Sequence, residues 1–99
     1  MKIPILLPNI FDHPFTYKSS DANLKLGDYV EVPFGKSTKV GIVWDEFEKN
    51  KNKQYLIKNV IRKLQIPSLN IETINFLKWF SEYNIVPIGM SLKLHLLSN

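Results

Sequence analysis

Residues 32–44, VPFGKSTKVGIVW, contain two apolar runs separated by Pro33, Phe34, Gly35 and a loop with two lysines. Short apolar runs rich in β-branched residues and bounded by Gly and Pro are typical of strands. The stretch therefore predicts two strands of one sheet. A two-residue turn would be enough to join them, so the Pro-Phe-Gly segment indicates a connection wider than a minimal hairpin turn.

Other strand-like segments lie on both sides of this stretch. Gly27 and Asp28 form a predicted turn before the upstream strand, and Gly41 inside the downstream strand indicates a bulge or a close backbone approach. Residues 55–64 alternate in side-chain type and are interpreted as a strand, although a short helix also fits. The other predicted strands are residues 2–8, 15–19, 29–32 and 39–47.

The last third of the chain changes from a strand period to a helical one. Asn70 is suited to cap a helix that ends before residues 86–89, because Pro87 disfavours helical geometry in the residue before it. The apolar stripe of this helix consists of Ile74, Leu77, Trp79, Phe80 and Tyr83, and both Trp79 and Tyr83 are expected in the core. Leu92, Leu94 and Leu96 alternate, so the tail is expected to return to the sheet. The predicted fold is mainly β, a small barrel-like sheet closed by one C-terminal helix.

Composition limits the classes of protein to which the chain can belong. Its 99 residues are enough for one domain, and 44% of them are hydrophobic, so a modest core is expected. There is no cysteine and only two histidines, His13 and His95, which argues against disulfides and a structural zinc site. We expect no metal and no cofactor. No apolar run is long enough to span a membrane, so no membrane partner is expected.

Positive charge gathers in one part of the chain. The net charge is +4, and residues 49–63, KNKNKQYLIKNVIRK, hold six basic residues and no acid. Arg62 is the only arginine among thirteen basic residues. Lysine supplies point charge for phosphates, whereas reading of guanine edges usually uses arginine. The pattern favours contact with a nucleic-acid backbone without base specificity, with a solvated lysine loop as the alternative for Lys49, Lys51 and Lys53.

No pattern in the sequence indicates catalysis. The Gly-Lys-Ser-Thr at residues 35–38 lacks the glycine spacing of a phosphate-binding loop and lies between strands instead of opening a helix. His13 beside Pro14 and His95 in a leucine-rich tail are not in the setting of a catalytic base. We predict no catalytic residue and no enzyme activity for this domain alone.

Four segments in order resemble one known family. They are LLPNIFDHPFTY, LKLGDYVEVPFGKSTKVGIVW, IKNVIRKL and FLKWFSEYNIVPIGMSL, which together extend over nearly the whole chain. This order resembles the N-terminal, 3′-end DNA-binding domains of the replication-restart helicase PriA, also called primosomal protein N′. The resemblance implies that residues 1–99 are one DNA-binding domain, an N-terminal fragment of a longer ATP-dependent helicase.

The resemblance also implies a binding site. In that family a pocket takes the terminal nucleotide at the 3′ end of the nascent leading strand at a stalled fork. The matching positions are Phe15, Thr16, Gly35 and Lys58, and the Pro-Phe-Gly segment would form a pocket wall. Further DNA contacts are predicted for Asp12, Tyr17, Lys36, Lys39 and Arg62.

One position departs from the family pattern. The family usually has Phe-Asp-Tyr where this chain has Phe15, Thr16 and Tyr17, so a hydroxyl replaces a carboxylate. A competing register places Phe11 and Asp12 at the site. We prefer Phe15 and Thr16 because they keep the spacing to neighbouring motifs, and we keep Asp12 as a substitute carboxylate.

The implied partners are branched DNA with a 3′ end, the remaining helicase domains in the same chain and other primosome proteins. The implied location is the bacterial cytoplasm, at the nucleoid. Two other functions stay open from the residues alone. One is a small β-barrel that binds nucleic acid without regard to strand ends, and the other is a protein-interaction module.

Overall fold

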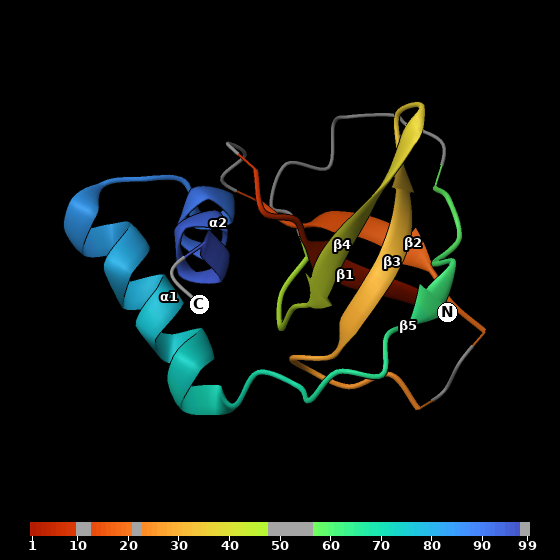
Figure 1. Cartoon of the computed structure of the whole chain (residues 1–99), viewed down its shortest axis with the longest axis horizontal. Helices are drawn as coiled ribbons and strands as arrows, with labels where there is room; N and C mark the ends of the chain where they lie inside the picture. Colours follow the sequence, from red (N-terminus) through yellow and green to blue (C-terminus); the bar gives the residue numbers. More distant parts are fainter. Residues whose placement is uncertain (10–12, 21–22, 48–56, 98–99) are drawn as a thin grey trace.

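The computed structural model describes residues 1–9, 13–20, 23–47 and 57–97. A sheet occupies one side of the molecule and two helices the other (Figure 1). The predictions for Asp12 and for Lys49, Lys51 and Lys53 lie outside the described residues. The elements are β1 (Lys2–Leu6), β2 (Phe15–Lys18), β3 (Tyr29–Phe34), β4 (Ser37–Val43), β5 (Arg62–Lys63), α1 (Ile71–Asn84) and α2 (Ile88–Leu97).

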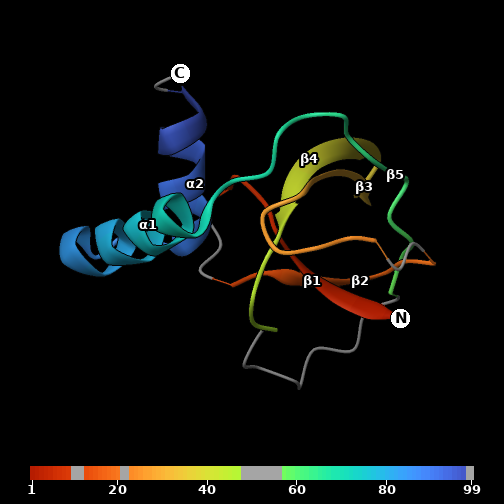
Figure 2. The ribbon, with the colours of Figure 1, turned by 90° about the horizontal axis from the view of Figure 1, so that it is seen from below.

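The five strands form one antiparallel sheet in the order β2-β1-β4-β3-β5. The sheet is curved, as the view from below shows (Figure 2). Beyond its ladders, one isolated parallel bridge joins Lys18 of β2 to Asn59, in the segment before β5. A single bridge is no ladder, so the sheet is not closed and the predicted barrel is not confirmed.

The β3–β4 connection is tighter than the sequence predicts. Phe34 pairs with Ser37, and only Gly35 and Lys36 lie between the two strands. Gly35 has a φ of 62°, whereas Lys36 has no positive φ. A left-handed first position with Gly is typical of the type II′ hairpin turn, whose twist matches that of the flanking strands. The prediction of a wide connection was therefore wrong, because Pro33 and Phe34 belong to β3.

Strand β1 is buried on both faces, which explains why its sequence alternates poorly. Ile3, Ile5 and Leu7 belong to a core cluster with Tyr17 and residues of β3, on one face of the sheet. Leu6 points to the other face, into a second cluster that includes Leu77. A strand covered on both sides reads as a continuous apolar run. The second cluster consists of Leu6, Ile42, Trp44, Ile74, Leu77 and Leu92.

Helix α1 begins and ends where the sequence predicts. The Asn70 side chain accepts a hydrogen bond from the Thr73 amide at 2.8 Å, which caps the first turn. The helix stops at Ile85, whose φ of 54° is left-handed. The predicted apolar stripe is confirmed only in part: Trp79 is 55% exposed and Tyr83 69%, so the prediction that these two lie in the core was wrong. Ile74 and Leu77, from the same predicted stripe, are buried and face the sheet.

The tail after Pro87 is a helix and not a strand, so the prediction of one helix was wrong. Ile88, Leu92 and Leu96 are spaced four residues apart and pack in the second cluster, while Leu94 is 44% exposed. The alternating leucines therefore contain a helical stripe as well. Inside the helix pair, the buried Ser91 hydroxyl donates to the Leu77 carbonyl at 2.9 Å.

Two remaining predictions are confirmed in part. Gly41 lies at a close approach and not at a bulge. The ladder between β4 and β3 is continuous through Gly41, and a Cβ on this residue would lie 2.5 Å from the Ile5 side chain. Of the predicted strand 55–64, Tyr55 and Leu56 lie outside the described residues. In the described part, Arg62–Lys63 form a strand and Asn59 forms an isolated bridge, so the prediction of a strand is confirmed only there.

Candidate nucleic-acid interface

A cavity of about 340 Å³ opens where β2, the end of β3 and the segment before β5 meet. These three segments lie far apart in the sequence. The four residues that the resemblance predicts for the terminal nucleotide, Phe15, Thr16, Gly35 and Lys58, all line it. We call this cavity the end pocket; its lining residues are Phe15, Thr16, Tyr17, Pro33, Phe34, Gly35 and Lys58.

Aromatic rings form the apolar part of the end pocket. The Phe15 and Phe34 rings meet edge to face, with centroids 5.4 Å apart and planes at 76°. The His13 ring also contacts Phe15, at 4.9 Å between centroids. Edge-to-face packing is a favoured aromatic geometry, so these contacts fix the Phe15 ring. The sequence argument placed Phe34 in the pocket wall as part of the Pro-Phe-Gly segment, but it did not include His13 among the site residues.

Tyr17 holds two walls of the end pocket together. Its ring is buried in the first core cluster, and its hydroxyl donates to the Pro33 carbonyl at 2.8 Å. Strands β2 and β3 are not neighbours in the sheet, so this bond spans its concave side. A buried tyrosine hydroxyl usually finds such a partner. Tyr17 therefore supports the cavity chiefly by packing and by this bond.

Lys58 reaches the end pocket from a fixed backbone. Its carbonyl accepts a hydrogen bond from the Lys18 amide at 2.9 Å, and the Val60 amide donates to the Lys18 carbonyl at 2.8 Å. Lys58 itself is exposed. The arrangement presents an ammonium group at the rim of an apolar cavity, where it can meet a phosphate or another anionic oxygen.

Gly35 contributes open space at the tip of the β3–β4 hairpin. A Cβ built on it would have no heavy atom within 4 Å. The turn alone accounts for glycine at this position, because its φ is left-handed. The same open space gives a ligand free access to the backbone at Gly35.

The additional contacts predicted from the sequence are spread over the surface. Lys36 lies at the hairpin tip, and Arg62 is paired with Glu31 at 2.9 Å on β3. Lys39 lines a second cavity, of about 230 Å³, beside the end pocket. Phe34 lines both cavities. Lys93 of α2, which the sequence argument missed, lines the second cavity as well.

Neither a cluster of metal ligands nor a helix that could span a membrane is found among the described residues. They contain no group of three or more His, Cys, Asp or Glu side chains that could hold a metal ion. Neither helix in that part of the chain is long and apolar enough to cross a membrane. The lining of the end pocket offers aromatic surface, the Thr16 and Tyr17 hydroxyls and the Lys58 ammonium group.

Comparison with known proteins supports the family resemblance that the order of the four sequence segments indicates. A family model described as the 3′ DNA-binding domain of PriA matches residues 3–96. The replication restart protein PriA of Rickettsia conorii (strain ATCC VR-613 / Malish 7) is 36% identical over 93 residues. These residues cover 91% of this chain and 14% of that relative. The chain therefore belongs to the PriA family of 3′ DNA-binding domains.

Proposed function

We propose that the chain binds the 3′ end of a DNA strand and that the end pocket holds the terminal nucleotide. One observation carries this proposal: Phe15, Thr16, Gly35 and Lys58 come from separate segments and converge on one cavity in a chain of this family. Its volume of about 340 Å³ is within the range of small-ligand sites, about 300–1,000 Å³. In a full-length PriA the ligand would be the nascent leading strand at a stalled fork, and its capture would position a helicase motor.

Each lining group has a role in this proposal. The Phe15 ring supports the terminal base by stacking, which requires no particular base. Lys58 meets the phosphate, and open space beside Gly35 admits the sugar. The Thr16 hydroxyl bonds the 3′-hydroxyl, since a hydroxyl can both donate and accept. A carboxylate would form a stronger, charge-assisted bond, so we expect weaker end selectivity than in family members with aspartate at this position.

The test is fluorescence anisotropy with two short single-stranded DNAs that differ only in a 3′-hydroxyl or a 3′-phosphate. We expect the hydroxyl end to bind about threefold to tenfold tighter, the effect of roughly 1 kcal/mol for one hydrogen bond. Phe15→Ala should weaken binding of the hydroxyl end by about 1–3 kcal/mol, the usual contribution of one base–aromatic stack.

Phe47→Ala is the matched control, because Phe47 is a half-exposed phenylalanine that lines neither cavity. It should bind both DNAs as the unsubstituted chain does. Equal binding of both DNAs, abolished by salt and unaffected by Phe15→Ala, would contradict the proposal. That result would support binding of nucleic acid through lysine charge alone.

A second candidate function, binding of protein, is favoured by one surface of α1. Phe76, Trp79 and Tyr83 are each about half exposed or more, and the Trp79 and Tyr83 rings stack at 5.0 Å and 10°. We call these three residues the aromatic face. Lys78, the only cation of α1, is paired with Asp45, while Glu72 and Glu82 are exposed. This charge does not suit DNA, so we propose that the occupant is the remaining polypeptide of a PriA protein.

The aromatic face is tested with the double variant Trp79→Ser/Tyr83→Ser. The partner is the R. conorii PriA from which the segment matching this chain has been deleted. Calorimetric titration should detect binding that the double variant weakens at least tenfold, since central aromatic contacts usually contribute about 2 kcal/mol or more. The Phe47→Ser control should bind normally. Absence of binding, or equal loss in the control, would argue against the aromatic face as a docking surface.

A further inference from the structure

The second cavity adjoins the end pocket and has a different chemical character. Phe34 is the wall that the two cavities share. Lys39 of β4 and Lys93 of α2 both line the second cavity, so a strand and a helix each contribute one lysine to it. The described residues that line it include no carboxylate. We call it the lysine pocket; its lining residues are Leu7, Pro8, Asn9, Phe34, Lys39 and Lys93.

Both lysines are available for a ligand. The ion pairs among the described residues are Arg62–Glu31, Lys63–Asp28 and Lys78–Asp45, and none includes Lys39 or Lys93. Both side chains are exposed. Two ammonium groups at one cavity, with no acid among its described lining residues, raise the local positive potential, which favours an anion. Leu7, Pro8 and Phe34 add apolar surface, which suits a sugar or a base beside that anion.

A strand held by its 3′ nucleotide must leave the end pocket on its 5′ side. Every further nucleotide brings one phosphodiester charge. The lysine pocket shares Phe34 with the end pocket, so the two cavities adjoin at this residue and a strand can continue from one into the other there. Lys36 at the hairpin tip and Arg62 beside Glu31 line neither cavity and offer no such continuation.

We propose that the lysine pocket binds the phosphodiester groups of the nucleotides next to the 3′ terminus. The ligand is then a single-stranded 3′ tail of several nucleotides, and the terminal nucleotide is only its end. This inference rests on the proposed function of the end pocket. It assigns to Lys39 and Lys93 contacts with the DNA backbone. The binding energy from these contacts depends on the length of the strand but not on its base sequence.

The test measures the binding of two single-stranded ligands with a 3′-hydroxyl, a dinucleotide and a tetranucleotide. Each ligand is titrated with the unsubstituted chain and with the double variant Lys39→Ala/Lys93→Ala. The tetranucleotide should bind the unsubstituted chain about tenfold tighter than the dinucleotide, and the double variant should lose that gain. Binding of the dinucleotide should not change. For the tetranucleotide, the magnitude of the slope of log K, the binding constant, against log salt concentration should be about 1.4 smaller in the double variant. The variant loses two single-strand phosphate contacts, and each contributes about 0.7 to the slope.

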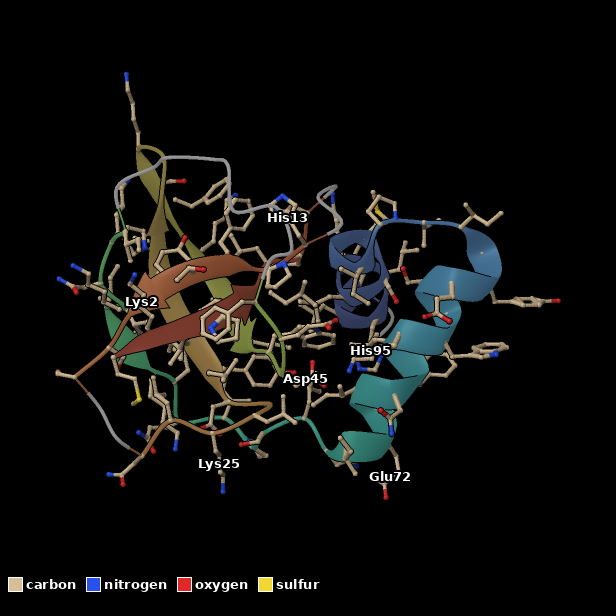
Figure 3. The ribbon with its side chains drawn as sticks, turned by 180° about the vertical axis from the view of Figure 1, so that it is seen from behind. Lys2, His13, Lys25, Asp45, Glu72 and His95 are labelled. Carbon is tan, nitrogen blue, oxygen red and sulfur yellow. The ribbon has the colours of Figure 1, made fainter. Side chains whose placement is uncertain are left out.

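Two controls separate this proposal from the function on which it rests. Lys25→Ala removes an exposed lysine at the end of the molecule away from His13 (Figure 3), and it should not affect either ligand. Lys93→Arg should keep most of the gain. If the tetranucleotide binds the double variant as it binds the unsubstituted chain, or if Lys25→Ala causes the same loss, the lysine pocket is refuted. A dinucleotide that is insensitive to Phe15→Ala would instead refute the end pocket.

Discussion

Gly27→Ala is expected to lower the free energy of unfolding by about 3 kcal/mol. The φ of Gly27 is +91°, a conformation that an L side chain adopts only with strain of about 1–3 kcal/mol. A Cβ at this position would lie 2.3 Å from the Leu69 carbonyl oxygen, which is backbone and cannot rotate away. Relief requires a shift of the chain, and overpacking of this kind costs roughly 1–3 kcal/mol more.

Gly27 holds together parts of the chain that are far apart in sequence. Its amide donates to the Val43 carbonyl at 2.9 Å, and its own carbonyl accepts from the Leu69 amide at 3.0 Å. The contact therefore joins the start of β3, the end of β4 and the segment that leads into α1. Displacement of Leu69 would disturb the packing of both helices on the sheet.

The Gly27→Ala prediction is checked by urea denaturation followed by circular dichroism. Gly35→Ala is the matched control, since Gly35 also has a positive φ but has open space where the Cβ would lie. The control should lose only about 1–2 kcal/mol, the backbone strain alone. Equal losses in the two variants would mean that the close approach to Leu69 adds nothing.

The fold was predictable where the pattern in the sequence is local. Strands β1 to β4 and the bounds of α1 follow from apolar runs, turn residues and the Asn70 cap. Gly27 was predicted as a turn residue, but its approach to Leu69 depends on tertiary packing that no local pattern contains. Helix α2 was missed because Leu92 and Leu96 fit both a period of two and a spacing of four. Leu94, which a strand would place on the same face as these two, is 44% exposed, and this distinguishes the helix.

The candidate site was predictable only through the family resemblance. Phe15, Gly35 and Lys58 have no shared local pattern, because the curvature of the sheet brings β2, β3 and the segment before β5 together. Lys93 could not be placed beside Lys39 while the tail was interpreted as a strand. The exposure of Trp79 and Tyr83 was also hidden, since an aromatic residue on a helical stripe reads as core.

Asp28→Asn is expected to destabilise the fold by about 3 kcal/mol at neutral pH. The Asp28 side chain is 1% exposed, and its carboxylate accepts hydrogen bonds from the Ser68 hydroxyl and from the Lys25 amide, the latter at 3.0 Å. Lys63 lies 3.5 Å away. An amide keeps the shape but removes the negative charge that faces Lys63 and replaces one of the two acceptor oxygens by an NH2 group, and an unpaired buried group costs about 1–3 kcal/mol.

The loss in Asp28→Asn should depend on pH. Burial by itself raises the pKa of the Asp28 carboxyl, but the hydrogen bonds from Ser68 and Lys25 and the charge of Lys63 outweigh it, so the pKa lies below its ordinary value. A carboxyl with a lowered folded pKa contributes stability above its unfolded pKa, about 3.9, and loses it as the pH falls through the folded value. The difference from the unsubstituted chain should be constant from pH 7 to about pH 5 and shrink below about pH 4.

Denaturation in urea at pH 7, 5, 4 and 3 measures this dependence, and Asp45→Asn supplies the control. Asp45 is also paired with a lysine, Lys78, but about a third of its side chain is exposed, near α1 (Figure 3). Exposed pairs contribute only about 0–1 kcal/mol, so Asp45→Asn should cost little at any pH. A difference for Asp28→Asn that stays constant down to pH 3 would mean that the side chain acts through its shape and not through its charge. A narrowing difference would show that the ionised carboxylate is what holds the Lys25 turn, β5 and Ser68 together.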